Sequence, residues 1–350
     1  MNILVLGGGA QGRVIARDLA RSMRDAQVVV ADVTQPSLPA LPNLEWIETD
    51  LSDIPAMARM LRAYDLGVGA LPSRLGFASM QAAIEAKRNL VDVSFAAEDT
   101  LPLDPAARAA GITIAPDCGL APGLSHLLVG HFAGVQGTPD EVLIMVGGVA
   151  ADSSRPYGYV VTWSLDDLLE EYVRPARIIR DGQRVEVPAF SALEHVAIPG
   201  VGEMEAFYSD GLRTLLETLP GVREMGEKTL RWPGHAEAVQ PLVKRGNLLE
   251  ELRRHCTANP PHDLVVLDVR MRWGDVRREI TMTDYYDAKT GLTAMSRTTA
   301  YTTSVVAQLA ARGGLTEKGI QPLECVGRDE KAYAFIVGEM ERRGVKFSGA

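Results

Sequence analysis

The sequence predicts an α/β protein in which a doubly wound parallel sheet is joined to a second, α+β domain that contains an antiparallel sheet. Over residues 1 to about 120, short apolar segments alternate with segments of helix length, which is typical of parallel strands covered on both faces. A glycine-rich turn directly follows the first apolar segment, and longer, more polar strands appear after about residue 123. The apolar segments are 3–6, 28–31, 46–47, 66–70, 90–93 and 112–115.

Two segments in the second half of the chain predict a β-hairpin. Residues 264–273 and 277–285 have the composition of strands, and the Gly274-Asp275 dipeptide between them is a turn signal. Several prolines interrupt the chain between residues 156 and 233. This pattern favours an α+β domain over a continuation of the parallel sheet.

The last part of the sequence is helical again, over 295–311 and 331–343, and we expect these helices to pack on the first domain. The first domain would then be discontinuous, with residues 1–122 and about 295–350. Residues 123–294 would form a second domain for substrate binding and oligomerisation.

Composition and charge exclude several classes of function. The 36 Lys and Arg residues against 45 Asp and Glu residues give a net charge of −9, which argues against a nucleic-acid binder. The three cysteines and six histidines show no metal-ligand or disulfide spacing, so we predict no metal site. The chain lacks an apolar run of about 20 residues and a signal peptide, so we expect a cytoplasmic protein without membrane association.

Residues 7–12, with the sequence GGGAQG, match the pattern G-x-G-x-x-G between a strand and a helix. Gly7 permits the tight turn, Gly9 lets the backbone approach a pyrophosphate, and Gly12 allows close packing of helix on strand. The helix dipole and unpaired N–H groups then favour the phosphates. We predict a Rossmann-type dinucleotide site here, with Ala10 and Gln11 also in contact with the cofactor.

Asp32 ends the second apolar strand, 20 residues after Gly12. A carboxylate at this position accepts hydrogen bonds from the adenosine ribose and repels a 2′-phosphate, so we predict NAD as the cofactor. Arg13, next to Gly12, could reach a phosphate of the cofactor, or it could be a solvated helix residue. Asp50 could lie near the adenine, or cap the helix that follows it.

The fourth strand runs into small residues and then Leu71 and Pro72, which would let a cofactor pass over the backbone at the carboxyl edge of the sheet. Asp117 and Cys118 follow the sixth apolar segment at the same edge. Asp117 is our first candidate for the catalytic base, with a helix cap as the alternative. Cys118 could contact the nicotinamide or the substrate, or be a buried inert thiol.

Several longer segments resemble the saccharopine dehydrogenase-like family, and most closely its lysine 6-dehydrogenase branch. The resemblance covers nearly the whole chain, and its most specific parts lie between Trp163 and His235. One departure is His126, which follows Ser125 where many homologues have asparagine. The resembling segments are 70–77, 91–94, 117–125, 162–164, 170–176, 206–215, 228–235 and 294–301.

The resemblance implies NAD-linked oxidation of the lysine ε-amine to 2-aminoadipate 6-semialdehyde, which cyclises to a piperideine carboxylate, with release of ammonia. It also implies a homodimer or higher homo-oligomer. Ser94, in one resembling segment, is expected to contact the cofactor.

Such a reaction needs groups that move protons, and His235 is a second candidate for a general base. An amino-acid carboxylate calls for a guanidinium fork, so Arg231 and Arg297 are favoured as its ligands. The other candidate substrate contacts are Arg174, Tyr172, Tyr208 and Asp210.

Two other interpretations stay open. The chain could be another saccharopine-type dehydrogenase, acting on saccharopine or a carboxylated polyamine, which would need room for more carboxylates. It could also be a non-catalytic protein that senses a dinucleotide.

Overall fold

The computed structural model describes residues 1–350 and divides into two compact units. Unit 1 contains residues 1–131 and 299–343, and unit 2 contains residues 132–298 and 344–350. The boundaries that we expected from the sequence, at 122 and 295, lie a few residues before the observed boundaries at 131 and 299. The last seven residues go with unit 2 rather than unit 1, because a short strand there pairs with a strand of unit 2.

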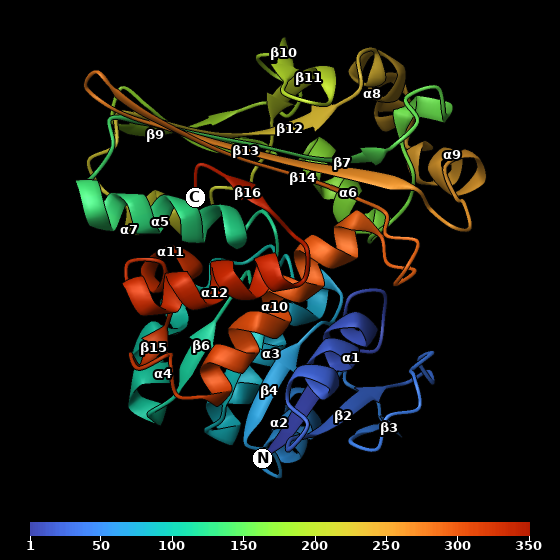
Figure 1. The fold of residues 1–350 in the computed structure, drawn as a ribbon, viewed down its shortest axis with the longest axis vertical. Coiled ribbons are helices and arrows are strands. Elements are labelled where there is room, and N and C mark those ends of the chain that lie inside the picture. Colours follow the sequence, from blue (N-terminus) through green and yellow to red (C-terminus); the bar gives the residue numbers. More distant parts are fainter. The chain divides into compact units, whose positions relative to one another are not determined.

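Unit 1 is built on a seven-stranded parallel sheet in the order β15-β6-β5-β4-β1-β2-β3 (Figure 1). The chain reverses direction across the sheet between β1 and β4, which is the topological switch point of a doubly wound fold. The predicted fold class is therefore confirmed. The strands are β1 (Asn2–Leu6), β2 (Gln27–Asp32), β3 (Leu44–Glu48), β4 (Leu66–Gly69), β5 (Asn89–Asp92), β6 (Thr113–Ala115) and β15 (Gly319–Ile320).

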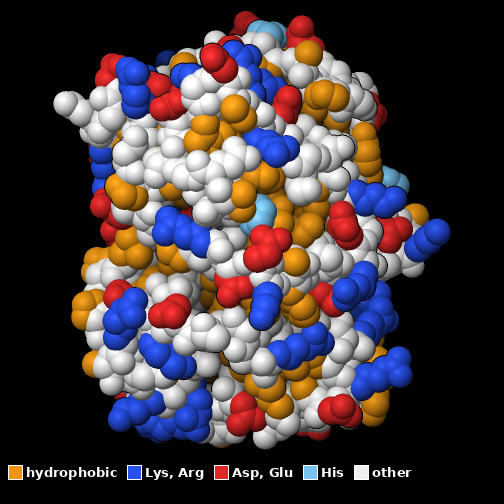
Figure 2. Space-filling model, turned by 60° about the vertical axis from the view of Figure 1, so that its left-hand side comes forward, with side chains coloured by type: hydrophobic (Ala, Val, Ile, Leu, Met, Phe, Trp, Pro, Cys, Tyr) orange, Lys and Arg blue, Asp and Glu red, His pale blue; other side chains and the backbone are white.

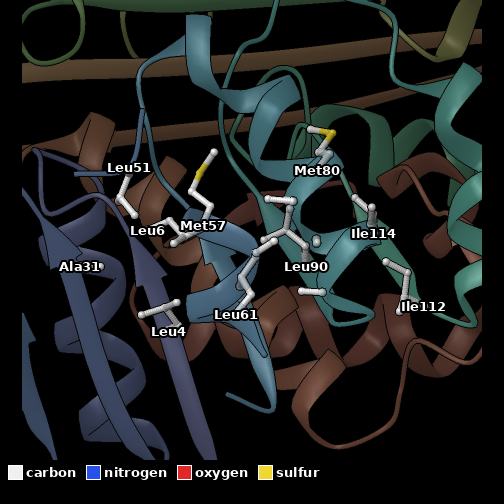
Figure 3. Packing of buried hydrophobic residues seen from close by; sticks show 14 of the residues in the cluster. Leu4, Leu6, Ala31, Leu51, Met57, Leu61, Met80, Leu90, Ile112 and Ile114 are labelled. Atoms are coloured by element: carbon white, nitrogen blue, oxygen red, sulfur yellow. The ribbon is translucent and has the colours of Figure 1, made fainter. Parts of the chain in front are cut away.

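Helices pack on this sheet because the strands bury apolar side chains on both faces. On one face, side chains from β1, β5 and β6 form one cluster with those of α2 and α3, and Figure 3 labels Leu4, Met57, Met80 and Leu90 among its members. Burying each such side chain stabilises the fold by roughly 1.5–3 kcal/mol. The helices of unit 1 are α1 (Gly12–Ser22), α2 (Ile54–Leu61), α3 (Ser73–Ala86), α4 (Asp104–Ala110), α11 (Leu323–Val326) and α12 (Glu330–Arg342).

Two further helices, α5 (Leu124–Gln136) and α10 (Ala294–Ala311), run from one unit into the other. Within unit 1, α10 is tied to α1 because the Ser304 hydroxyl donates to the Asp18 carboxylate at 2.6 Å. Arg343, at the end of α12, also donates to Asp18. Three helices that are distant in sequence thus share one mostly buried carboxylate.

Unit 2 contains a nine-stranded sheet in the order β10-β11-β12-β7-β13-β14-β16, with β8 and β9 joined at β12. The predicted hairpin is present as β13 and β14, paired from Leu264↔Tyr285 to Trp273↔Val276. The sheet is mixed rather than antiparallel, because β7 and β12 are parallel. The strands are β7 (Glu141–Ala150), β8 (Ala176–Arg180), β9 (Gln183–Val187), β10 (Glu194–Ile198), β11 (Gly202–Tyr208), β12 (Glu224–Arg231), β13 (Asp263–Trp273), β14 (Val276–Tyr285) and β16 (Phe347–Ser348).

One face of β11 and β12 is covered by helices through a cluster that includes Tyr159, Tyr172 and Phe207. These helices of unit 2 are α6 (Leu165–Val173), α8 (His235–Arg245) and α9 (Leu248–His255), and α7 (Leu215–Thr218) is a further short helix. None of the helices is both long enough and apolar enough to span a bilayer. Figure 2 shows acidic and basic side chains interspersed with hydrophobic ones over one face of the surface.

Candidate active site

The glycine turn after β1 has the geometry that a dinucleotide requires. Gly7 has φ +99°, and a Cβ atom there would lie 2.6 Å from the carbonyl oxygen of Ala70. A Cβ atom on Gly12 would lie 1.9 Å from the carbonyl oxygen of Gly7. Gly9, in contrast, faces open space, with nothing within 4 Å of such an atom. Two glycines are thus required by packing, and the third leaves the backbone accessible to a phosphate.

Helix α1 begins at this turn without a side-chain cap and without an acidic residue in its first turn. Gln11 occupies the cap position, and its Oε1 atom is buried without a hydrogen-bond partner. Ala10 is exposed beside it. An uncapped N-terminus carries a partial positive charge, so the start of α1 fits an anionic group such as a pyrophosphate.

Asp32, the last residue of β2, lies against the glycine turn. Its Oδ2 accepts a hydrogen bond from the Gly8 N–H at 2.6 Å, and its Oδ1 accepts one from the Thr34 N–H at 2.9 Å. The carboxylate is therefore fixed at the position where a Rossmann site meets the adenosine ribose. Asp50 instead accepts from the Ser52 N–H, and the cap of α2 is Asp53.

The ends of β4 and β5 bring three predicted cofactor residues together. The Ser94 hydroxyl donates to the carbonyl of Leu71 at 3.1 Å, and Pro72 precedes the first residue of α3. Gly76 in α3 has no room for a Cβ atom, which would lie 2.5 Å from Ser94. The loops after β4 and β5 therefore form one packed rim at the carboxyl edge of the sheet.

Asp92, which we did not predict as a site residue, lies under this rim. It ends β5, is fully buried, and accepts hydrogen bonds from the Ser79 hydroxyl and the Ser94 N–H. Burial raises its pKa to about 6, and the charge of Asp117 adds to the shift. The signal that could have found it is the one that found Asp32, namely an aspartate that ends an apolar strand at the ligand-binding edge.

Asp117 and Cys118 lie in the loop after β6. Asp117 is 4% exposed and has φ +52°, a left-handed conformation that is uncommon outside glycine. The Cys118 thiol is fully buried and donates to the carbonyl of Ala115, and burial raises its pKa well above the ordinary value. The Cys118 thiol therefore stays protonated. Asp117 lies at the same edge of the sheet as the glycine turn.

Unit 2 holds a second buried polar cluster, on the face of β12 that α6 and α8 cover. The guanidinium of Arg231 donates from Nε to the Tyr172 hydroxyl at 2.8 Å and from Nη2 to the Glu171 carboxylate at 3.1 Å. Its Nη1 donates to the carbonyl of Leu230. The Arg231 side chain is only 3% exposed, so it is a buried charge neutralised by Glu171.

His235 completes this cluster, and its tautomer follows from its partners. Nδ1 lies 2.7 Å from the carbonyl of Tyr157, which can only accept, so Nδ1 carries the proton. Nε2 is then the acceptor for the Tyr172 hydroxyl at 2.8 Å. Burial and the charge of Arg231 lower the pKa of His235 to about 3. Both ring nitrogens are engaged, so in this arrangement His235 orients Tyr172 rather than serving as a free base.

The start of α8, and with it His235, is fixed by Glu205 of the neighbouring strand β11. This buried carboxylate accepts hydrogen bonds from the N–H groups of Gly234 and Ala236. A carboxylate at a helix N-terminus is favoured by the helix dipole.

The other predicted substrate residues have different partners. Arg297 donates to Asp284 at 2.7 Å and to Asp287 at 3.3 Å. Asp210 accepts two hydrogen bonds from the guanidinium of Arg177. Arg174 pairs with Glu170 and lies 4.0 Å from the Asp210 carboxylate, and Lys228 lies over the ring of Tyr208. The structure thus brings Tyr172, Arg231 and His235 together, whereas Arg297 forms its ion pairs elsewhere in unit 2.

Four further polar residues here, namely Glu171, Ser209, Glu227 and Thr229, were missed by sequence reasoning. Thr229 donates to Ser209 and contacts Glu171, while Glu227 is buried with no hydrogen-bond partner at Oε2. Burial raises the pKa of Glu227 well above its ordinary value, and the charges of Glu171 and Asp210 add to this. Side chains alternate along a strand, so Glu227, Thr229 and Arg231 lie on one face of β12. Polar residues at every second position of this strand are the sequence pattern that could have indicated the cluster.

Comparisons with known proteins match both parts of the chain. A family model described as "Saccharopine dehydrogenase NADP binding domain" matches residues 3–115, and "Saccharopine dehydrogenase C-terminal domain" matches residues 119–345. Saccharopine dehydrogenase (NADP(+), L-glutamate-forming) from Saccharomyces cerevisiae is 29% identical over 267 residues, covering 71% of this chain and 59% of that protein. The mitochondrial alpha-aminoadipic semialdehyde synthase of Bos taurus is 27% identical over 203 residues, covering 54% of this chain and 22% of that protein.

The chain therefore spans three fifths or less of these curated relatives. Among solved structures, apo saccharopine dehydrogenase (L-Glu forming) from Saccharomyces cerevisiae matches with a TM-score of 0.75. The match has 19% sequence identity and covers 99% of both chains. At that identity the match shows a shared fold.

Proposed function

The chain belongs to the saccharopine dehydrogenase family, and from that membership we propose that it is an NAD-linked dehydrogenase that oxidatively deaminates the ε-amine of lysine. The lysine 6-dehydrogenase assignment rests on the resembling segments between Trp163 and His235. Its support in the structure is that Tyr172, from segment 170–176, and Arg231 and His235, from segment 228–235, form one buried hydrogen-bonded cluster.

The proposed reaction converts lysine, NAD⁺ and water into 2-aminoadipate 6-semialdehyde, NADH, ammonium and one proton. The ε-ammonium group must first lose a proton, because a hydride leaves the ε-carbon only when the nitrogen can donate its lone pair. The bound nicotinamide supplies the hydride acceptor. Asp117 accepts the ammonium proton in this proposal, and water then adds to the resulting iminium to release ammonia.

The position of the Asp32 carboxylate is the observation that favours NAD over NADP. Its carboxylate is held against the glycine turn by two backbone N–H groups, so a 2′-phosphate at the ribose would meet a fixed negative charge. The relatives above have NADP(+) in their names, and the family model is that of an NADP-binding domain. We therefore propose that this chain differs from them in cofactor preference.

Replacing Asp32 by alanine tests this preference. Loss of a hydrogen-bonded charged acceptor should weaken NAD binding by about 1–3 kcal/mol, and the ratio of NADP to NAD affinity should rise because the repulsion is removed. Fluorescence titration with NADH and NADPH measures both. Asp25→Ala, an exposed aspartate before β2, is the control and should leave both affinities unchanged. Equal NADH affinity in wild type and Asp32→Ala would remove Asp32 from the ribose site.

The substrate is tested by NADH formation with L-lysine, saccharopine, ornithine and a carboxylated polyamine in parallel, together with an ammonia assay. Lysine-dependent NADH formation with stoichiometric ammonia supports the proposal. Oxidation of saccharopine without ammonia release favours the saccharopine-type alternative instead. Tight NADH binding with no turnover of any amine would favour a dinucleotide sensor.

A further inference from the structure

Glu227, on β12 of unit 2, is a buried carboxyl group without a partner. Its side chain is 4% exposed, and no donor reaches its buried Oε2 atom. Buried carboxylates in proteins are nearly always hydrogen-bonded or paired with a cation, because desolvation of a lone charge is costly. Glu205 of the adjacent strand shows the ordinary case, since it accepts from two N–H groups at the start of α8. Glu227 is thus open to a donor that the chain itself does not supply.

Direct contacts fix Glu227 against the loop that follows β11. A Cβ atom on Gly211 would lie 1.6 Å from Oε1 of Glu227 and 2.3 Å from Oε2, so the loop approaches the carboxyl group this closely only with glycine. The Ser209 N–H donates to the carbonyl of Glu227 at 3.2 Å. The Ser209 hydroxyl accepts from Thr229, which also contacts Glu171 of α6. Glu227 therefore lies at one end of the buried polar cluster on β12.

The two carboxylates next to Glu227 already have their cations. Glu171 pairs with Arg231 at 3.1 Å, and Asp210 accepts two hydrogen bonds from Arg177. Burial raises the pKa of Glu227 well above its ordinary value, and the charges of Glu171 and Asp210 raise it further. Two ion pairs and a third acidic group thus leave this end of the cluster one positive charge short.

A positive group beside Oε2 would complete the arrangement. The charge of Arg213 favours the ionised form of Glu227, but Oε2 still has no donor. An ammonium group carries three N–H donors and a full charge, so it can bond Oε2 and favour the ionised carboxylate. A metal ion fits less well, because the structure contains no group of three or more acidic, histidine or cysteine side chains arranged to hold one. Solvent reaches the cluster at Glu171, whose side chain is 17% exposed.

We propose that Glu227 binds the ammonium group of the substrate that is not oxidised, which in lysine is the α-ammonium group. The site then selects amines that carry a second, non-reacting ammonium group. It discriminates against 6-aminohexanoate, which has the chain, the reacting amine and the carboxylate of lysine but lacks the α-amine. The proposal rests on the proposed function and deepens it, because it assigns the end of the substrate that does not react.

Calorimetric titration of the protein with NADH bound tests the proposal without turnover. Wild type should bind L-lysine about 10–100-fold more tightly than 6-aminohexanoate, the effect expected for a charge-assisted hydrogen bond. Glu227→Gln removes the charge and keeps the shape, so it should weaken lysine binding by a similar factor and leave 6-aminohexanoate binding unchanged. Equal affinities of wild type for the two ligands, or an equal effect of Glu227→Gln on both, would overturn the proposal.

The unfolding midpoint separates a binding role from a structural one. Removing a structural carboxylate leaves its donors unpaired, but Oε2 of Glu227 has no donor to lose. Glu227→Gln should therefore keep or raise the midpoint of the ligand-free protein. Glu227→Asp retains the charge on a shorter side chain, so it should keep a preference for lysine over 6-aminohexanoate. A lowered midpoint in Glu227→Gln, with no preference restored in Glu227→Asp, would assign Glu227 to the fold and overturn the proposal.

Asp268 of β13 supplies the matched control. It is fully buried and accepts hydrogen bonds from Arg270. Asp268 and Lys228 are both paired with Met145 of β7, so Asp268 lies on the opposite face of the sheet from Glu227. Asp268→Asn should leave both ligand affinities as in wild type. A loss of lysine affinity as large as that in Glu227→Gln would mean that any buried carboxylate of this sheet produces it, and would overturn the proposal.

Saccharopine separates failure of this proposal from failure of the proposed function, because its lysine part carries the same α-ammonium group. If saccharopine rather than lysine is the substrate, the proposed function fails, yet Glu227→Gln should still weaken saccharopine binding about 10–100-fold. If lysine is oxidised but its affinity does not depend on Glu227, the proposed function stands and this inference fails. A wild-type protein that binds neither ligand in the titration would also overturn it.

Discussion

Arg231→Ala should lower the free energy of unfolding by about 3–5 kcal/mol, because it removes a buried charge and leaves the mostly buried Glu171 carboxylate without its cation. Glu171, the partner of Arg231, is only 17% exposed. The substitution also removes the donor to the Tyr172 hydroxyl, which is itself hydrogen-bonded to His235. Urea unfolding followed by far-ultraviolet circular dichroism measures the loss.

Two further variants separate the buried pair from a general effect of losing arginine. Arg184 pairs with Glu217 in the same unit, but both side chains are about half exposed, so Arg184→Ala should cost about 0–1 kcal/mol. The double variant Arg231→Met with Glu171→Gln removes both charges and should recover much of the stability that Arg231→Ala loses. Equal losses in Arg231→Ala and Arg184→Ala would show that the buried pair has no special weight.

Much of unit 1 could be predicted from the sequence because its signals are local. Six of its seven parallel strands lie at the predicted apolar segments, and the glycines of the first turn are needed by contacts within a few residues or with the adjacent strand. The two-residue strand β15 was not predicted, because no such apolar run marks it. The hairpin of β13 and β14 was predictable for the same reason, since a turn signal lies directly between the two strands.

The pairing of β7 with β12 could not be predicted in this way. These strands are separated by the helices α6 and α7 and by four strands, and their parallel alignment depends on how those elements pack. The pairing of β16 with β14 is equally remote, because the last residues of the chain return to unit 2. Local patterns indicate strands, whereas the order of strands in a mixed sheet depends on contacts between distant segments.

The candidate site also combines features that local sequence patterns predict with features that depend on contacts between distant segments. Asp32 follows from the spacing after a strand, but the ion pair of Arg231 with Glu171 requires α6 to lie on the Arg231 face of β12. The sequence predicts Arg231 as a ligand of a substrate carboxylate from its residue type, and it gives no sign of the ion pair with Glu171. The substrate role of Arg231 stays a prediction. The proton of His235 likewise depends on the carbonyl of Tyr157, and the backbone of a distant loop leaves no signature in the sequence.

Asp117→Asn should reduce kcat by about 10²–10⁴-fold, the effect expected when a general base is removed, with NADH affinity retained. The substitution suits this position because Asp117 has φ +52°, and asparagine adopts the left-handed conformation as readily as aspartate. Stopped-flow measurement of NADH formation gives the turnover, and NADH fluorescence gives the affinity. Any loss then reports on the carboxylate rather than on backbone strain.

Asp181→Asn is the matched control, because Asp181 has φ +50° in the exposed turn between β8 and β9 and lies outside the proposed site. It should leave turnover, NADH affinity and the unfolding midpoint as in wild type. Undiminished turnover in Asp117→Asn would remove Asp117 as the base. A parallel loss of NADH affinity would assign it instead to shaping the loop, because a group that acts only on the ammonium proton has no reason to change the affinity for NADH.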